Sequence, residues 1–249
     1  MTEHLFSLSS ATPGRQGAAT LPLPSSLPIV YRSAGLVAVD KPSGLAVHRG
    51  QSHDAVHALE LVRDQVGAYV YPVHRLDRGT SGVLVFALSA EAARSLSRAF
   101  EAGSIEKRYV ALVRGVPPDH VRVDHPLSRD DGKAPQPAVT ELRTLLRYGR
   151  YALVEATPRS GRTHQIRRHL KHLSCPIIGD VRYGKGDHNR WFRTRYAFHR
   201  LALHASSLTL FDVATQKNVT IHAPLPHAIA TTLVALERDD ALGLATGPR

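Results

Sequence analysis

The sequence predicts an α+β protein with a mixed, mainly antiparallel sheet and flanking helices. Segments with strand-like apolar patterns outnumber those with helical spacing, and the two rarely alternate one to one, which argues against a doubly wound parallel sheet. The chain has 249 residues and is 43% hydrophobic, so it can bury a sizeable core. No internal repeat or strong linker divides it. We expect one domain over residues 29–240, a flexible tail at 1–28 and a frayed end at 241–249.

The expected strands are short segments that are β-branched, aromatic or alternating in hydrophobicity. The clearest is GVLVFALS, residues 82–89, a continuous apolar run of strand length. The stretch 29–48 gives shorter β-like pieces, broken by turns that contain Gly and Pro. Further strands are expected at 106–115, 151–158, 201–212 and 218–224.

Four segments have the apolar spacing of helices. Residues 89–103 form the best defined one, with Ser89 at the N-cap and Gly103 at the C-cap. Thr163 is the expected N-cap of a helix with a basic outer face. That basic helix is expected at 163–174, and the other two helices are expected at 54–66 and 227–240.

Charge and cysteine content restrict the class of protein. Lys and Arg number 32 against 21 Asp and Glu, a formal net charge of +11, which favours a polyanionic partner. The single cysteine, Cys175, excludes an internal disulfide and a multi-cysteine zinc site. No apolar run approaches the roughly 20 residues of a membrane span, and the N-terminus lacks a secretory signal. A cytoplasmic protein without a membrane partner is expected.

Several familiar kinds of site do not fit the sequence. Among the fifteen histidines, His164 and His169 are five apart and do not share a helix face, and no carboxylate or Cys nearby completes a metal site. A hydrolase triad of Ser81, His74 and Asp77 lacks the G-x-S-x-G elbow. We therefore expect no metal and no nucleotide cofactor.

One carboxylate in basic surroundings remains as a candidate for catalysis. Asp77 lies between Arg75 and Arg78 in HRLDRGTSG. Nearby cations favour the ionised form, and an ionised carboxylate can act as a nucleophile or a base. The same stretch also fits a simple turn in which Asp77 caps backbone N–H groups.

Two further clusters are basic. The segment RSGRTHQIRRHLKH contains Arg162, His164, Arg167 and Arg168 and opens a helix, where arginines and helix N-termini bind phosphate. A solvated basic helix face is the alternative interpretation. Tyr109 follows two basic residues at the start of a strand, where it either packs or stacks on an unpaired base.

Together and in this order, the clusters resemble the RluA-type pseudouridine synthases. The resemblance rests on KPSGLAVH, HRLDRGTSGVLVFA, IEKRYVALVRG, GRTHQIRRHL, PIIGDVRYG and LALHASSL, between about residues 36 and 210. The shorter blocks PQPAVT, RRHLKHL and GDHNR are most similar to the branch that modifies uridine 65 in the acceptor-stem region of tRNA.

The resemblance implies the pseudouridine synthase catalytic fold with a central RNA-binding cleft. It implies isomerisation of uridine without cofactor or metal, by base flipping and aspartate-dependent cleavage and re-formation of the glycosidic bond. Asp77 falls on the catalytic aspartate, Tyr109 on the active-site tyrosine and Arg162 on the basic partner of the aspartate. Ile166 would lie beneath the base, and Arg75 would fill the gap left by the flipped nucleotide. Other RNA-binding residues are expected at Arg78, His164, Arg167 and Arg168.

Some alternatives stay open from the sequence. The same chemistry could act on ribosomal RNA instead of tRNA. A non-catalytic RNA-binding protein or RNA chaperone could use the same basic cleft without needing Asp77. The carboxylate could attack the substrate or abstract a ribose proton. RNA is the expected partner, and the protein is expected to be a monomer.

Overall fold

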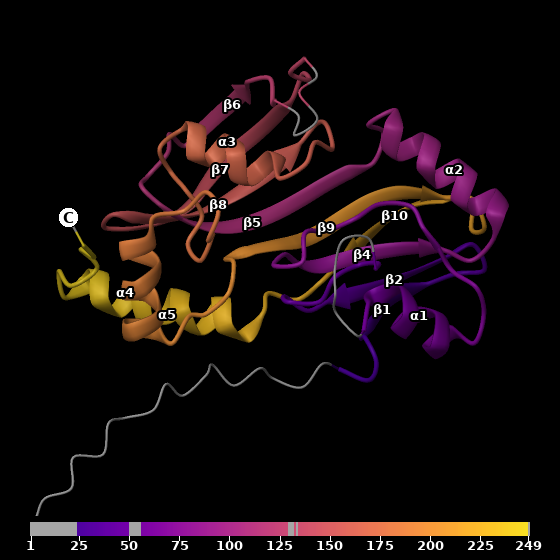
Figure 1. Ribbon diagram of the computed structural model, residues 1–249, viewed down its shortest axis with the longest axis horizontal. Coiled ribbons are helices and arrows are strands. Elements are labelled where there is room, and N and C mark those ends of the chain that lie inside the picture. The colour runs from indigo at the N-terminus through magenta and orange to yellow at the C-terminus, as the bar shows by residue number, and fades with distance from the viewer. Residues whose placement is uncertain (1–23, 50–55, 129–131, 133, 249) are drawn as a thin grey trace, which may run out of the picture.

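The computed structural model describes residues 24–49, 56–128, 132 and 134–248. It contains strands and helices in an order that confirms the α+β prediction (Figure 1). The elements are β1 (Ile29–Arg32), β2 (Leu36–Lys41), α1 (Ala58–Val66), β3 (Tyr71–Pro72), β4 (Ser81–Ala87), α2 (Ala90–Glu101), β5 (Glu106–Arg114), β6 (His120–Asp124), β7 (Val139–Tyr148), β8 (Tyr151–Pro158), α3 (Gln165–His172), α4 (Gly186–Tyr196), β9 (Leu203–Asp212), β10 (Lys217–His222) and α5 (His227–Ala241).

The described strands form one sheet of ten strands. Its main path runs β1-β2-β4-β9-β5-β8-β7-β6, with β10 paired to β9 and β3 paired to β4. The pair β4–β9 is parallel, and the other strand pairs within the described residues are antiparallel. The sheet is therefore mixed and mainly antiparallel, as predicted. The parallel pair lies where the half built from β1, β2 and β4 meets the half built from β5 to β8.

Strand β4 separates two of the three apolar cores. Because side chains alternate along a strand, Leu84 and Phe86 face the core that α1 covers, while Val83 and Val85 face the core that α2 covers. All seven residues of β4 are buried, as expected for a strand with helices on both faces. The third core lies beneath α3, α4 and α5 in the other half of the sheet (Figure 1).

Four elements lie in segments without a predicted helix or strand: β3, β6, β7 and α4. Helix α4, with the sequence GDHNRWFRTRY, is mostly polar and shows little helical periodicity. Trp191 and Phe192 of this helix pack on Tyr151 of β8, with ring centroids 5.6 and 4.9 Å apart. Such contacts come from a distant strand, so local spacing does not reveal them.

Of the three helix caps that the sequence predicts, one is confirmed and two differ by one residue. Ser89 caps α2 as predicted, since its Oγ accepts a hydrogen bond from Ala92 N–H at 3.1 Å. Gly103 follows the C-cap of α2 by one residue and adopts a positive φ of 69°. The N-cap of α3 is His164 and not Thr163, and its side chain makes no capping hydrogen bond.

The ordered structure extends beyond both predicted domain limits. Leu27 is fully buried and exchanges two hydrogen bonds with the side chain of Gln65, so the described fold begins before residue 29. At the other end, Arg150 donates a hydrogen bond to the Pro248 carbonyl at 2.8 Å, and the predicted fraying is not observed there. Residues 1–23 of the predicted tail and the first two residues of the predicted helix 54–66 lie outside the described residues.

Two histidines, His74 partly buried and His204 fully buried, make stability depend on pH. Nε2 of His74 accepts a hydrogen bond from Val85 N–H at 2.9 Å, and burial, together with the charge of Lys107, lowers the pKa of His74 to about 3. His204 is fully buried, with Nδ1 2.9 Å from Ser81 Oγ, and burial lowers its pKa to about 4. Both imidazoles are therefore neutral in the folded protein at neutral pH.

We expect the free energy of unfolding to fall as pH decreases from about 6.5 towards 4. In this window the unfolded chain takes up protons that the folded chain excludes, so stability is lost on acidification. Each histidine adds a slope of up to about 1.4 kcal/mol per pH unit. Urea unfolding at neutral pH and in mild acid measures this slope. The His74→Gln variant keeps an acceptor for Val85 and cannot titrate, so its slope should be shallower, and an unchanged slope would contradict the assignment.

Candidate active site

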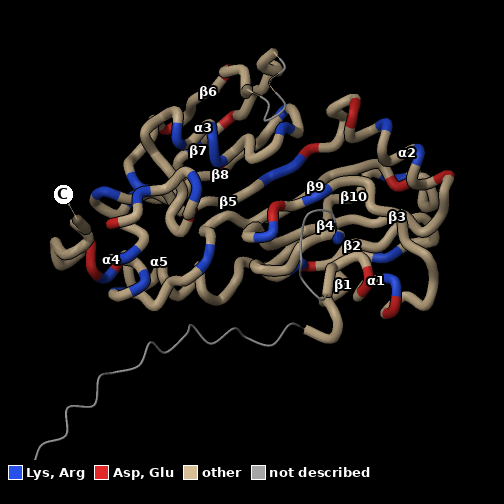
Figure 2. Tube along the Cα trace, in the orientation of Figure 1, with Lys and Arg blue, Asp and Glu red and all other residues tan. Residues whose placement is uncertain are grey.

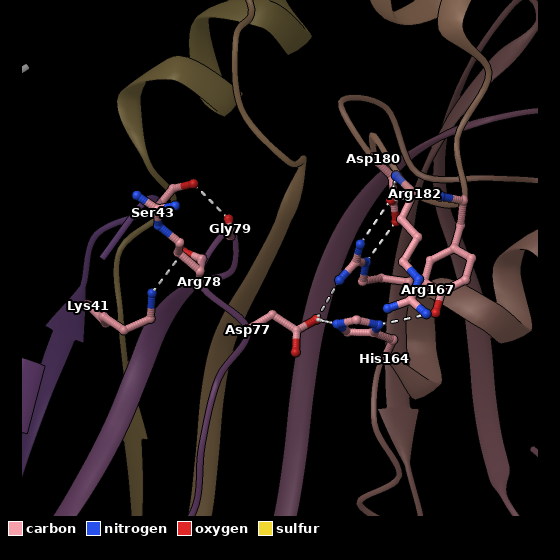
Figure 3. A network of polar contacts seen from close by, with 10 residues as sticks. Lys41, Ser43, Asp77, Arg78, Gly79, His164, Arg167, Asp180 and Arg182 are labelled. Carbon is pink, nitrogen blue, oxygen red and sulfur yellow. Dashed lines mark hydrogen bonds and ion pairs between the residues drawn. The ribbon is translucent and has the colours of Figure 1, made fainter. Parts of the chain in front are cut away.

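Buried polar contacts hold the loop that carries Asp77 (Figure 3). Lys41, at the end of β2, is fully buried, and its ammonium donates hydrogen bonds to three carbonyls, among them that of Arg78 at 3.3 Å. Ser43 Oγ donates to the Gly79 carbonyl at 2.6 Å. Burial lowers the pKa of Lys41 to about 7. These bonds tie the residues directly after Asp77 to the end of β2.

Close approach of two strands explains the glycine that follows this loop. Gly82 pairs with Ala205 in the parallel β4–β9 contact and has a φ of 111°. A Cβ at this position would lie 2.1 Å from the Ala205 carbonyl oxygen, so only glycine fits. Thr80 N–H donates to the Asp77 carbonyl at 3.0 Å. The stretch is thus a turn closed by the Asp77 carbonyl, but the Asp77 side chain contacts Arg167 and does not serve as the expected cap of backbone N–H groups.

The carboxylate of Asp77 meets an arginine from the other half of the sheet. Nη1 of Arg167, on α3, donates a hydrogen bond to Asp77 Oδ2 at 3.0 Å. The same guanidinium donates through Nε and Nη2 to the two oxygens of Asp180, at 2.7 and 2.9 Å. Arg167 therefore bridges two carboxylates, and Figure 3 shows it between them.

The Arg167–Asp180 part of the bridge is buried, and both groups are held in their charged forms. Burial alone would raise the pKa of Asp180, but hydrogen bonds from Arg167 and from the N–H groups of Tyr183 and Arg182 outweigh it and hold the pKa below its usual value. Burial likewise opposes the charge of Arg167, yet its bonds to Asp180 and Asp77 raise its pKa. A guanidinium with two carboxylate partners keeps its orientation better than one with a single exposed partner.

The prediction that Arg162 is the basic partner of Asp77 is wrong. Arg162 is exposed in the loop before α3, where its Nε donates to the Pro137 carbonyl at 3.2 Å. Helix α3 begins at Gln165, which turns Arg167 towards Asp77 and leaves Arg162 at the rim. Arg167, expected only as an RNA-binding residue, occupies the position that the sequence analysis assigned to Arg162.

Tyr109 and Ile166 form apolar walls beside the carboxylate. Tyr109 lies on β5 and packs against the cores on both sides of the cleft. Burial and the negative charge of Asp77 raise the pKa of its phenol, so the ring is neutral. Ile166, next to Arg167 on α3, is 6% exposed. Both residues line the same cleft as Asp77.

The cleft has a volume of about 560 Å³ and a basic lining. Five Lys or Arg residues line it against two acidic residues, and Figure 2 shows further Lys and Arg on α3, β5 and α4. Of the expected RNA-binding residues, Arg75 and His164 line the cleft with Ile166. Arg78 and Arg168 do not: Arg78 donates to the Gly44 carbonyl, and Arg168 donates to Ser128.

Sequence reasoning missed the residues that support the site from behind. Asp180 lies in PIIGDVRYG, where a carboxylate directly after an apolar run is a signal for a buried ion pair. Gln165 is buried; its Oε1 accepts from Ser160 Oγ and Arg162 N–H, while its Nε2 donates to the Val139 carbonyl. The loop leading into α3 is thereby fixed to the sheet.

The described residues hold neither a metal-binding cluster nor a membrane-spanning helix. No group of three His, Cys, Asp or Glu side chains among them is placed to bind a metal ion. Within the same residues, no helix is long and apolar enough to cross a bilayer.

Comparison with known proteins identifies the family of the chain. Residues 35–172 match the family described as RNA pseudouridylate synthase. The solved structure of human RNA pseudouridylate synthase domain containing 4 superposes with a TM-score of 0.72 at 27% identity, covering 84% of this chain and 93% of that one. Human RNA pseudouridylate synthase domain containing 1 gives a TM-score of 0.69 at 27% identity, covering 92% and 100%.

Bacterial relatives are more similar in sequence. A protein named tRNA pseudouridine synthase C from Pasteurella multocida is 42% identical over 221 residues, 80% of this chain and 91% of the relative. The protein of the same name from Salmonella typhimurium is 45% identical over 223 residues, 80% of this chain and 85% of the relative.

The fold and the site define an isomerase that acts on RNA. The chain belongs to the RluA-type RNA pseudouridylate synthase family, and it is an RNA pseudouridine synthase.

The corrected ion pair gives a test that separates the two arginines. Arg167→Lys keeps the charge, but an ammonium lacks the planar fork that binds both oxygens of Asp180 while a third N–H reaches Asp77. We expect the single-turnover rate of pseudouridine formation to fall by about 10- to 100-fold. Arg162→Lys is the matched control, and its rate should stay within about threefold of the unsubstituted protein. The opposite ranking of the two variants would restore Arg162 as the partner of Asp77.

Proposed function

We propose that this protein converts one uridine of tRNA, at position 65 in the acceptor-stem region, to pseudouridine, with Asp77 as the catalytic carboxylate. The observation that carries the catalytic assignment is the asymmetry of this carboxylate. Its Oδ2 accepts a hydrogen bond from Arg167 at 3.0 Å, while no described group donates to Oδ1. One oxygen is held and the other is available to react.

The isomerisation exchanges one bond for another without gaining or losing atoms. The bond between uracil N1 and ribose C1′ breaks, C5 forms a bond to C1′, C5 loses a proton and N1 gains one. Asp77 acts either as a nucleophile on the substrate or as a base that takes a ribose proton. Both routes need an ionised carboxylate with a fixed direction, which Arg167 supports.

The cleft has the parts needed to hold a flipped base. A base within an RNA stem must leave the stack at a cost of a few kcal/mol, and contacts to the flipped base and the phosphates offset that cost. In this proposal Tyr109 stacks on the uracil, Ile166 forms the floor and Arg75 fills the space left in the RNA. All three residues line the cleft.

Two observations support tRNA over ribosomal RNA. The blocks PQPAVT, RRHLKHL and GDHNR resemble the tRNA branch of the family, and the bacterial relatives carry the name tRNA pseudouridine synthase C. The net charge of +11 suits a folded, phosphate-rich partner.

Asp77→Asn separates catalysis from RNA binding. The amide is nearly isosteric but is neither a nucleophile nor a base, so tritium release from RNA labelled at uridine C5 should be abolished. RNA affinity should stay within about threefold, because phosphate contacts supply most of it. A variant that releases tritium at the original rate would contradict the catalytic assignment of Asp77. An unsubstituted protein that binds RNA but releases no tritium would favour a non-catalytic RNA-binding protein.

Mapping of pseudouridine tests the substrate. The purified protein is incubated with unmodified tRNA and rRNA transcripts, and pseudouridine is located at nucleotide resolution. We expect one new pseudouridine in tRNA, at position 65, since the subfamily blocks resemble the tRNA branch. Modification confined to rRNA, or to another tRNA position, would overturn the substrate assignment while leaving the chemistry in place. The Asp77→Asn protein is the control in each reaction.

A further inference from the structure

His164 has a strained backbone beside the reactive carboxylate. Its φ and ψ of 55° and 26° lie in the left-handed region, which is sterically unfavourable for a non-glycine residue. Helix capping does not compensate for this strain, because the side chain of His164 makes no capping hydrogen bond. Such outliers gather at active sites, where the surrounding structure imposes them. The conformation instead directs the imidazole into the cleft, with its side chain 20% exposed.

The two ring nitrogens of His164 face different partners (Figure 3). Nε2 lies 3.8 Å from Asp77 Oδ2, the oxygen that also accepts from Arg167. Nδ1 lies 3.1 Å from the hydroxyl of Tyr183. At 3.8 Å the first contact is too long for a hydrogen bond, but it sets the sign of the charge that Nε2 meets. Contacts in an active site that are too long in the free enzyme often shorten to hydrogen bonds when substrate binds.

This arrangement selects one tautomer of the neutral ring. A lone pair on Nε2 would face a carboxylate and be repelled, whereas an N–H there is attracted. With the proton on Nε2, Nδ1 must accept, and Tyr183 can donate to it. Burial, aided by Arg167 and Arg182, lowers the pKa of His164 despite the opposing charge of Asp77, so the neutral form prevails at neutral pH.

The ring of Tyr183 is itself held in place. Arg167, Arg182 and Lys171 lie 5.1, 5.4 and 5.8 Å from its centroid, within the range of cation–π contacts. The rings of His164 and Tyr183 meet edge to face at 5.6 Å. The hydroxyl that fixes the tautomer of His164 is therefore positioned by the same arginine that binds Asp77.

We propose that His164 is a positioning residue for Asp77. The hydroxyl of Tyr183 donates a hydrogen bond to Nδ1 of His164, so the ring carries its proton on Nε2. This Nε2–H points towards Oδ2 of Asp77 and leaves Oδ1 as the reacting oxygen. This inference rests on the proposed function, because it takes Asp77 as the catalytic carboxylate. It adds two residues, His164 and Tyr183, that act through the carboxylate without touching the reacting atoms.

Kinetics test the role of His164. His164→Leu should lower the single-turnover rate about tenfold with RNA affinity unchanged, whereas His164→Gln, which keeps an N–H donor of similar reach, should recover most of the rate. His172→Leu, on the same helix but outside the cleft lining, is the matched control and should retain full rate. A full rate in His164→Leu, measured where Asp77→Asn is inactive, overturns this inference and leaves the proposed function standing.

A double-mutant cycle tests the order of action. Tyr183→Phe keeps the ring and its three cations but removes the hydroxyl, and it leaves the backbone of residue 164 untouched. It should lower the rate by about threefold alone and have no further effect in the His164→Leu background. Independent, additive losses would show that Tyr183 does not act through His164.

Nitrogen-15 NMR gives a readout that does not depend on activity. At neutral pH the His164 ring should carry its proton on Nε2 in the unsubstituted protein, and Tyr183→Phe should populate both tautomers. A proton on Nδ1 in the unsubstituted protein would overturn the inference whatever the enzyme modifies. A complete absence of pseudouridine formation with the expected tautomer would instead count against the proposed function.

Discussion

The bridge from Arg167 to Asp77 and Asp180 is the interaction on which the geometry of the site depends. Asp180 is fully buried and satisfied by the guanidinium and two backbone N–H groups. Removing one partner from such a buried pair leaves an uncompensated charge, which is far costlier than the net stabilisation the pair supplies. Asp180 therefore has no low-energy alternative to Arg167, and Arg167 in turn fixes Oδ2 of Asp77.

The same bridge joins the two halves of the sheet. Asp77 comes from the loop before β4, which Lys41 and Ser43 anchor to the end of β2. Arg167 comes from α3, which packs over the half that contains β7 and β8. The two halves meet at the parallel β4–β9 pair, where Gly82 permits the close approach. Precise placement of the carboxylate thus follows from sheet packing as much as from the ion pair.

Charge within the cleft is divided between two tasks. Arg167 offsets one of the two negative charges of Asp180 and Asp77, and the other Lys and Arg side chains at the lining outnumber the acidic ones, so the cleft keeps a net positive field. That field attracts RNA phosphates, while Tyr109 and Ile166 give the lining beside the carboxylate apolar surfaces. A positive cleft that contains one aimed anion reconciles RNA binding with carboxylate chemistry.

Local periodicity and contiguous motifs in the sequence are enough to predict the fold class, most strands and helices, and the family. They also predict that Asp77 and Tyr109 lie in the site. Tertiary structure decided what depends on distant contacts. Strands β6 and β7 and helix α4 have weak local patterns; α4, for example, is stabilised by Tyr151. The choice of Arg167 over Arg162 follows from where α3 begins. The two arginines are five positions apart on either side of the loop–helix boundary, so their side chains point in different directions. The pairing of Arg167 with Asp180, thirteen residues further on, exists only because the fold buries both.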